Sequence, residues 1–153
     1  YIANDNSNGQ TVLSGLNTDI DKLAIFLKEK KIKNIKLPVS APFHCKLMNK
    51  ATSIMTDKIK NTNFVKPKNV IISNVTGSGT QEIEEIKDLL IKQIESPVRW
   101  RESVIYMIKN GVTNFIEIGP GKVLSGLVKR IDKTVKVNSI NKLEDLKDIK
   151  LND

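Results

Sequence analysis

The chain has 153 residues, 39% hydrophobic and 27% charged, which is enough to bury the core of one domain, or of one domain and part of another. Its 25 basic and 17 acidic residues give a net charge of +8, which suits a polyanionic partner such as nucleic acid, a phosphorylated cofactor or an acidic protein. The lysines are scattered along predicted helix faces and only 5% of the residues are aromatic, which disfavours a nucleic-acid interface built on base stacking.

The first forty residues predict a strand, a helix and a second strand. Residues 4–9 form a turn-rich loop that leads into a short strand at 11–13. Residues 17–19 supply N-cap chemistry for a helix whose apolar residues recur at helical spacing through Leu27. Residues 32–39 return as a strand. These elements are half of a small α/β sandwich, which cannot close a core alone.

The remaining residues predict alternating helices and strands. A helix follows Pro42, a strand lies at 70–72, a glycine-bearing loop at 74–79 and a helix at 80–94. Ser96 and Pro97 are the expected N-cap and first residue of the next helix, which ends at Asn110 and Gly111. A strand at 114–118, a sharp turn at 119–121, a helix at 123–131 and a strand at 135–137 follow, and the charged tail 142–153 is expected to fray.

The strands have apolar rather than alternating centres and are separated by helices. This pattern is typical of an α/β fold with a parallel or mostly parallel sheet that helices cover on both faces. No run approaches the ~18 apolar residues of a membrane span, and the first residues do not resemble a signal peptide. We therefore expect a soluble, cytoplasmic protein.

His44 is the only histidine and Cys45 the only cysteine, so we expect no disulfide and no metal site. His44 lies where the strand 32–39 meets the next helix. Because imidazole titrates near neutrality and catalytic groups favour loops held by rigid elements, His44 is a candidate general base. The alternative is a structural imidazole at a helix start. Cys45 is a candidate thiol nucleophile, but a buried cysteine usually packs as a small hydrophobic residue.

Four segments together resemble the malonyl-CoA:acyl carrier protein transacylase family. They are residues 6–10 (NSNGQ), 37–48 (LPVSAPFHCKLM), 93–100 (QIESPVRW) and 117–124 (EIGPGKVL). The resemblance implies that residues 1–38 are the second half of a ferredoxin-like small subdomain and that residues 39–153 are the C-terminal part of a hydrolase-like acyltransferase subdomain. The family's usual loop has Ser-Pro-Gly-Gln, and Asn8 replaces its proline, a change that turn geometry tolerates.

The resemblance implies transfer of malonyl from malonyl-CoA to acyl carrier protein, in fatty acid biosynthesis, through a serine ester. A serine activated by His44 attacks the malonyl thioester, and the phosphopantetheine thiol of the carrier protein then takes the malonyl group. Gln93 matches the residue whose main-chain carbonyl orients the histidine. Malonyl-CoA and the carrier protein are substrates, so we expect no cofactor, and neither nucleic acid nor a membrane as partner.

The resemblance also implies which residues border the substrate. Phe43 matches a phenylalanine of malonyl-selective relatives, where the ring would crowd a substituent on the malonyl alpha carbon; core packing explains it equally well. Asn4, Asn6 and Gln10 match a loop that borders the acyl and pantetheine channel, although turn formation alone would explain the asparagines. Gly119 opens a turn that lacks the length of a phosphate-binding loop.

The family's nucleophile lies in Gly-His-Ser-Leu-Gly, and none of the ten serines here has glycine two residues before and two after it. The family's oxyanion-hole segment and carboxylate-binding arginine have no match either, so Arg99 and Arg101 are expected in surface or structural pairs. We therefore expect the C-terminal portion of an enzyme, which needs its N-terminal half and is inactive alone. A targeting segment in that half would make an organelle the compartment.

Two other functions remain as alternatives. One is a noncatalytic carrier-protein docking or scaffold fragment that keeps the fold without the serine half. The other is a basic nucleic-acid binder, whose affinity would fall steeply with salt.

Overall fold

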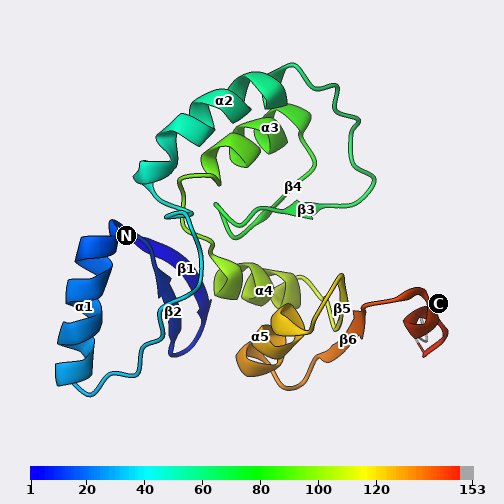
Figure 1. Ribbon diagram of the computed structural model, residues 1–153. Helices are drawn as coiled ribbons and strands as arrows, with labels where there is room; N and C mark the ends of the chain where they lie inside the picture. The colour runs from blue at the N-terminus through cyan, green and yellow to red at the C-terminus, as the bar shows by residue number, and fades with distance from the viewer. Residues whose placement is uncertain (149–153) are drawn as a thin grey trace.

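The computed structural model describes residues 1–148, and Figure 1 shows their arrangement. The hairpin β1–β2 and α1 form one group, α2, α3, β3 and β4 form a second, and α4, α5, β5 and β6 form a third. In chain order the elements are β1 (Ile2–Ser7), β2 (Gln10–Leu13), α1 (Asn17–Glu29), η1 (Lys46–Met48), α2 (Asn49–Lys60), β3 (Ile71–Ile72), β4 (Gly79–Thr80), α3 (Ile83–Lys92), α4 (Trp100–Lys109), β5 (Asn114–Ile118), α5 (Val123–Ile131), β6 (Lys136–Ile140) and η2 (Leu143–Asp148).

The strands of residues 1–148 pair as three separate two-stranded sheets. β5 and β6 are parallel, joined through α5, and this unit agrees with the predicted α/β pattern. The pairs β1–β2 and β3–β4 are antiparallel. The expected mostly parallel sheet with helices on both faces is therefore not formed as one sheet within the described residues, because each named strand pairs with only one other named strand.

The predicted loop at residues 4–9 is wrong for most of its length, because β1 extends through Ser7. Asparagine is a poor strand residue, but pairing on both edges of β1 outweighs that propensity. One edge pairs with β2. On the other edge, Val98 donates its N–H to the carbonyl of Ala3 at 2.7 Å and accepts the N–H of Asp5 at 2.9 Å.

The strand predicted at residues 32–39 is not formed. The segment is extended, but it has no ladder partner in the described part of the chain, and a strand requires a neighbour for its backbone groups. Its apolar side chains are between 49% and 76% exposed, as the values for Ile32, Ile35, Leu37 and Val39 show.

Two predicted helix starts are wrong. α1 begins after Leu16, whose carbonyl accepts the N–H of Asp19 at 3.0 Å, and no side chain caps it. α4 begins at Trp100 rather than after Ser96, because Val98 is held extended against β1. The predicted end of α4 is confirmed, since Asn110 is its C-cap and the next residue is a glycine with φ of 89°.

The best-formed core lies between α4, α5 and the β5–β6 pair. Val104, Val128 and Val135 are buried there at 0%, 3% and 9% exposure. The side chains packed against them are Trp100, Met107, Ile108, Phe115, Ile131 and Val137. The helical periodicity of α4 and α5 and the apolar centre of β5 are thus confirmed as core-forming patterns.

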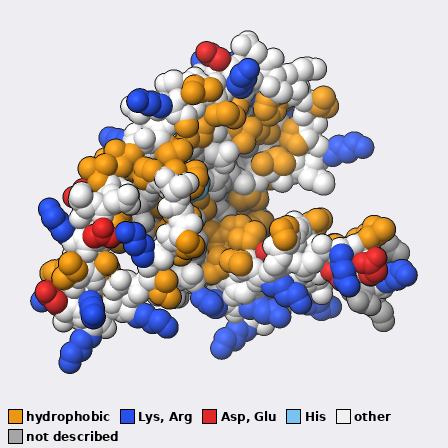
Figure 2. Space-filling model, in the orientation of Figure 1, with side chains coloured by type: hydrophobic (Ala, Val, Ile, Leu, Met, Phe, Trp, Pro, Cys, Tyr) orange, Lys and Arg blue, Asp and Glu red, His pale blue; other side chains and the backbone are white. Residues whose placement is uncertain are grey.

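Much apolar surface stays uncovered on residues 1–148. Seven hydrophobic side chains are buried, whereas 22 large ones are exposed. Figure 2 shows hydrophobic side chains along a hollow between the α2–α3–β3–β4 group and the third group. Apolar surface of this extent normally contacts another surface. Within the described residues, no helix is both long and apolar enough to cross a bilayer.

The charged tail forms η2 as far as Asp148, and residues 149–153 lie outside the described residues. The start of η2 is held by the carboxylate of Asp145, which accepts the N–H of Asn141 at 2.8 Å and that of Lys142 at 3.2 Å. The expected fraying therefore does not begin at residue 142.

The carboxylate of Glu117 in β5 caps the first turn of α5. It accepts the N–H of Ser125 at 2.7 Å and that of Leu124 at 3.2 Å. Hydrogen bonding by Ser125, first through its side chain and then its backbone, lowers the pKa of Glu117. A lowered folded-state pKa adds stability above the ordinary glutamate pKa and loses it as pH falls through the lowered value.

We therefore expect Glu117→Gln to lower the free energy of unfolding at neutral pH and to flatten its fall in acid. Urea unfolding followed by circular dichroism at neutral pH and at about pH 3 measures this. Glu29→Gln at an exposed position of α1 is the matched control. Equal acid dependence in the two variants contradicts the assignment of the cap.

Candidate active site

His44 lies two residues before η1, which leads into α2, at the predicted position near a helix start. Its φ is 59°, in the left-handed region that non-glycine residues seldom adopt. Such a backbone conformation costs about 1–3 kcal/mol and persists only where the surroundings hold it. The loop that carries His44 is therefore held by specific contacts.

Two side chains bind the carbonyls that precede His44. The hydroxyl of Ser14 donates to the carbonyl of Phe43 at 2.8 Å, and the thiol of Cys45 donates to the carbonyl of Pro42 at 3.1 Å. Ser14 is 8% exposed and Cys45 is 1% exposed, and Ser14 Oγ lies 3.8 Å from Cys45 Sγ. The buried, bonded thiol fits the structural interpretation of Cys45 and leaves it no path to a substrate.

The imidazole of His44 meets the end of α3. Its Nδ1 lies 3.0 Å from the main-chain carbonyl oxygen of Gln93, which is the C-cap residue of that helix. The last carbonyls of a helix lack intrahelical partners and are free to accept other donors. Because a carbonyl only accepts, Nδ1 of His44 carries the hydrogen, and Nε2 of the neutral ring keeps its lone pair for a proton.

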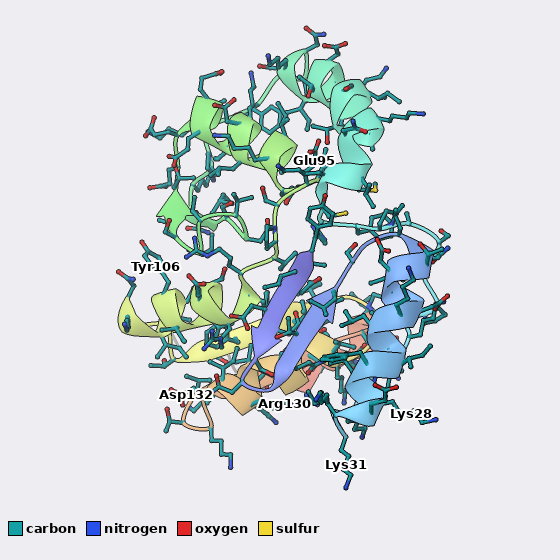
Figure 3. All side chains as sticks on the ribbon, turned by 90° about the vertical axis from the view of Figure 1, so that its left-hand side faces the viewer. Lys28, Lys31, Glu95, Tyr106, Arg130 and Asp132 are labelled. Carbon is teal, nitrogen blue, oxygen red and sulfur yellow. The ribbon has the colours of Figure 1, made fainter. Side chains whose placement is uncertain are left out.

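The chain after Gln93 is fixed on the other side of the site. It leaves α3, passes Glu95 and reaches Val98, which pairs with β1. In Figure 3 Glu95 lies where the end of α3 approaches the beginning of α2. The structure therefore brings His44 and Gln93 together from segments 49 residues apart.

The predicted substrate residues occupy different surroundings. Phe43 precedes His44 and is 48% exposed, so its ring is not core in the described part of the chain. Asn4 and Asn6 lie in β1 and are partly buried. Gln10 begins β2, and its side-chain oxygen accepts a hydrogen bond from Nη1 of Arg130 at 2.6 Å. Figure 3 shows Arg130 by the turn of the hairpin.

Within residues 1–148 no hydrogen bond joins Asn4, Asn6 or Gln10 of the hairpin to the imidazole of His44. A cavity of about 250 Å³ between β2 and α1 is lined by Ser14 and Leu47 among others, but by none of the predicted site residues. In the same residues no three His, Cys, Asp or Glu side chains are grouped to hold a metal ion.

Arg99 and Arg101 form the structural pairs that we expected. Arg101 binds both carboxylate oxygens of Asp5, with Nη2 to Oδ2 at 2.7 Å, and these hydrogen bonds raise the pKa of Arg101. Arg99 pairs with Glu102 and donates to the carbonyl of Thr76 at 3.0 Å. Both guanidinium groups are engaged by the chain itself.

Sequence reasoning missed two contacts that support the site. Ser14 lies 29 residues from Phe43, and Asp5 lies 96 residues from Arg101. No local pattern signals either contact, because each joins residues whose neighbourhood exists only in the fold.

The contact between His44 and Gln93 uses a main-chain atom of Gln93. Gln93→Ala is therefore expected to leave the Nδ1–H tautomer of His44 unchanged, since alanine keeps the carbonyl and suits a helix end. Two-bond ¹⁵N–¹H correlation spectra read the tautomer directly, because the chain has a single histidine. A change of tautomer in a folded Gln93→Ala chain would mean that the side chain, not the backbone, holds the ring.

No family model matches this chain. The malonyl CoA-acyl carrier protein transacylase of Staphylococcus aureus (strain COL) is 41% identical over 152 residues, which are 99% of this chain and 49% of that protein. The crystal structure of the transacylase from Clostridium perfringens has a TM-score of 0.90 and 41% identity, over 97% of this chain and 47% of its own.

A structure of a type II PKS acyl-carrier protein in complex with its malonyl-transacylase is also similar. Its TM-score is 0.90 at 34% identity, and the match covers 95% of this chain and 48% of that one. The chain thus spans about half the length of the relatives that it matches. In sequence and in fold, the chain is similar to about half of each of these malonyl-CoA:acyl carrier protein transacylases.

Proposed function

We propose that this chain is the C-terminal portion of a malonyl-CoA:acyl carrier protein transacylase, with His44 as general base and acid and the carbonyl of Gln93 as its orienting group. The observation that carries the proposal is the 3.0 Å contact between His44 Nδ1 and that carbonyl. It leaves Nε2 free to accept a proton, which is the state that a serine nucleophile requires of its base.

The two halves of the reaction use the same nitrogen. In the first, a serine hydroxyl from the remaining part of the enzyme gives its proton to Nε2 of His44 while its oxygen bonds to the malonyl thioester carbon. The C–S bond then breaks, and the imidazolium returns the proton to the coenzyme A sulfur. In the second, the carrier protein's thiol gives its proton to Nε2, its sulfur attacks the malonyl ester, and the serine oxygen regains the proton.

The main-chain carbonyl contributes orientation rather than charge. It binds Nδ1–H throughout the cycle, so the ring cannot turn its protonated nitrogen toward the serine. The left-handed backbone conformation of His44 determines where its side chain leaves the main chain. The carbonyl at the end of α3 determines the orientation of the imidazole ring. Both thioester partners bring their own reactive sulfur, so the proposed reaction needs no cofactor.

The proposed division into subdomains places residues 1–38 in the ferredoxin-like part and residues 39–153 in the acyltransferase part. Its boundary falls in the extended segment between α1 and η1. The proposal further assigns Asn4, Asn6 and Gln10 to the border of the acyl and pantetheine channel. Gln10 is bonded to Arg130, so its role there would be to hold the loop rather than to bind substrate freely.

The proposed partners are malonyl-CoA, an acidic acyl carrier protein and the N-terminal half of the same enzyme, in fatty acid biosynthesis in the cytoplasm. The net charge of +8 suits the phosphates of coenzyme A and an acidic carrier. The similar structure that holds an acyl-carrier protein supports the same partner. The 22 exposed apolar side chains suit burial against a second half of similar size.

The enzyme assembled from this chain and the other half is expected to transfer malonyl to carrier protein, whereas the 153-residue chain alone is not. In the assembled enzyme His44→Ala is expected to lower the transfer rate by about 10²–10⁴-fold, the usual share of a general base. Mass spectrometry of the carrier protein measures the transfer, and circular dichroism reports the fold.

Lys46→Ala at an exposed neighbouring position is the control and should keep activity. Wild-type transfer by a folded His44→Ala enzyme would end the assignment of the base. Binding of carrier protein with no transfer by the assembled wild type would favour the docking or scaffold alternative.

Phe43 is proposed to limit substituents on the malonyl alpha carbon. Phe43→Ala is expected to raise kcat/KM for methylmalonyl-CoA relative to malonyl-CoA by about ten-fold, as the removal of one methyl-sized clash does in other pockets. Competition between the two thioesters measures the ratio. Phe26→Ala is the matched control, because Phe26 is 51% exposed on α1 and Phe43 is 48% exposed. An unchanged ratio for Phe43→Ala assigns the ring to packing.

A further inference from the structure

We propose that Ser14 and Cys45 are positioning residues that hold His44 in its left-handed conformation, and that the β1–β2 hairpin thereby sets the geometry between His44 and Gln93. This inference deepens the proposed function, because it explains what places the base. Neither side chain is assigned contact with substrate.

Two side chains hold the backbone directly before His44. The orientation of the Phe43 carbonyl fixes the peptide plane from which φ of His44 is measured. Ser14 Oγ donates to that carbonyl at 2.8 Å, and Cys45 Sγ donates to the preceding carbonyl, that of Pro42, at 3.1 Å. Two consecutive carbonyls are thus bonded directly ahead of the residue with φ of 59°.

The Ser14 hydroxyl is supplied by the end of the β1–β2 hairpin. Ser14 follows β2 directly, and its N–H donates to the carbonyl of Tyr1 at 2.9 Å, which extends the hairpin pairing by one residue. It is 8% exposed, and its partner Cys45 is 1% exposed. Because water has little access to either donor, loss of one donor would leave a partly buried carbonyl without its partner.

The hairpin also contacts the segment that follows Gln93. The other strand of the same hairpin holds the segment that follows Gln93, since Ala3 and Asp5 in β1 bond Val98 on both sides. Arg101 then ties Asp5 to α4 through both carboxylate oxygens. One hairpin therefore anchors the His44 loop through the end of β2 and the Gln93 segment through β1.

This arrangement predicts a particular kinetic signature. If the loop loses its bonds, the imidazole can turn away from the Gln93 carbonyl, and both neutral tautomers become populated. Because Ser14 and Cys45 contact the backbone of the loop, their loss should act on kcat and leave KM nearly unchanged. A merely structural role would lower stability without moving the tautomer.

The test compares Ser14→Ala, which removes the donor, with Ser14→Thr, which keeps it. Ser125→Ala is the matched control, because Ser125 is also 8% exposed and bonds Ser139 at 2.7 Å far from His44. Cys45→Ala and Cys45→Ser form a second pair that removes or keeps the other donor. The ¹⁵N-histidine spectrum is recorded for the 153-residue chain, alone and assembled with an unlabelled other half, and kcat and KM are measured on the assembly.

We expect a single Nδ1–H tautomer in the wild type and averaged nitrogen shifts in Ser14→Ala and Cys45→Ala. In these two variants kcat should fall about five-fold with KM within about two-fold, as for the loss of one partly buried hydrogen bond. Ser14→Thr and Cys45→Ser should restore the wild-type spectrum, and Ser125→Ala should never lose it.

An unchanged tautomer and kcat in both alanine variants, with a stability loss like that of Ser125→Ala, would overturn the inference. The spectrum does not depend on malonyl transfer. Failure of the proposed function, seen as no transfer by the wild-type assembly, is therefore distinguishable from failure of the positioning role.

Discussion

A hydrogen bond between two neutral groups, Nδ1–H of His44 and the main-chain carbonyl of Gln93, is the constraint on which the rest of the site depends. A carbonyl offers no proton and carries no charge, so it selects one tautomer and one ring orientation. The acceptor is a backbone atom, and its place is therefore a property of the end of α3 rather than of a side chain. Any change in sequence that moves this helix end moves the partner of the imidazole.

This dependence gives the small hairpin an importance that its size does not suggest. β1 and β2 add little to the apolar core, yet they bond the segment after Gln93 through Val98 and the loop before His44 through Ser14. The strained φ of His44 is tolerable because the two carbonyls before it, those of Pro42 and Phe43, accept hydrogen bonds from Cys45 and Ser14. The geometry of the site is thus produced by polar contacts between segments that are distant in the chain.

The difference between local signals and contacts that are distant in the chain explains what could be predicted from the sequence. β5 at 114–118 and α5 at 123–131 were predicted with their observed bounds, because apolar periodicity and glycine turns are local signals. The position of His44 before a helix was also local. The extended segment 32–39, the strand β1 and the late start of α4 at Trp100 depend on which partner is within reach, and no window of sequence contains that partner.

The buried side chains are concentrated in one part of the chain, so the parts of the chain differ in local stability. α4, α5, β5 and β6 surround Val104 and Val128, so this part has a core of its own. No residue of α1 is buried, and the segment beside it exposes Ile35 at 76%. Local stability follows buried apolar contact, so the hairpin and the His44 loop, which adjoin the uncovered side, should loosen before the β5–α5–β6 unit does. The contact between His44 and Gln93 therefore depends on segments of low local stability, whereas the β5–α5–β6 unit has a core of its own.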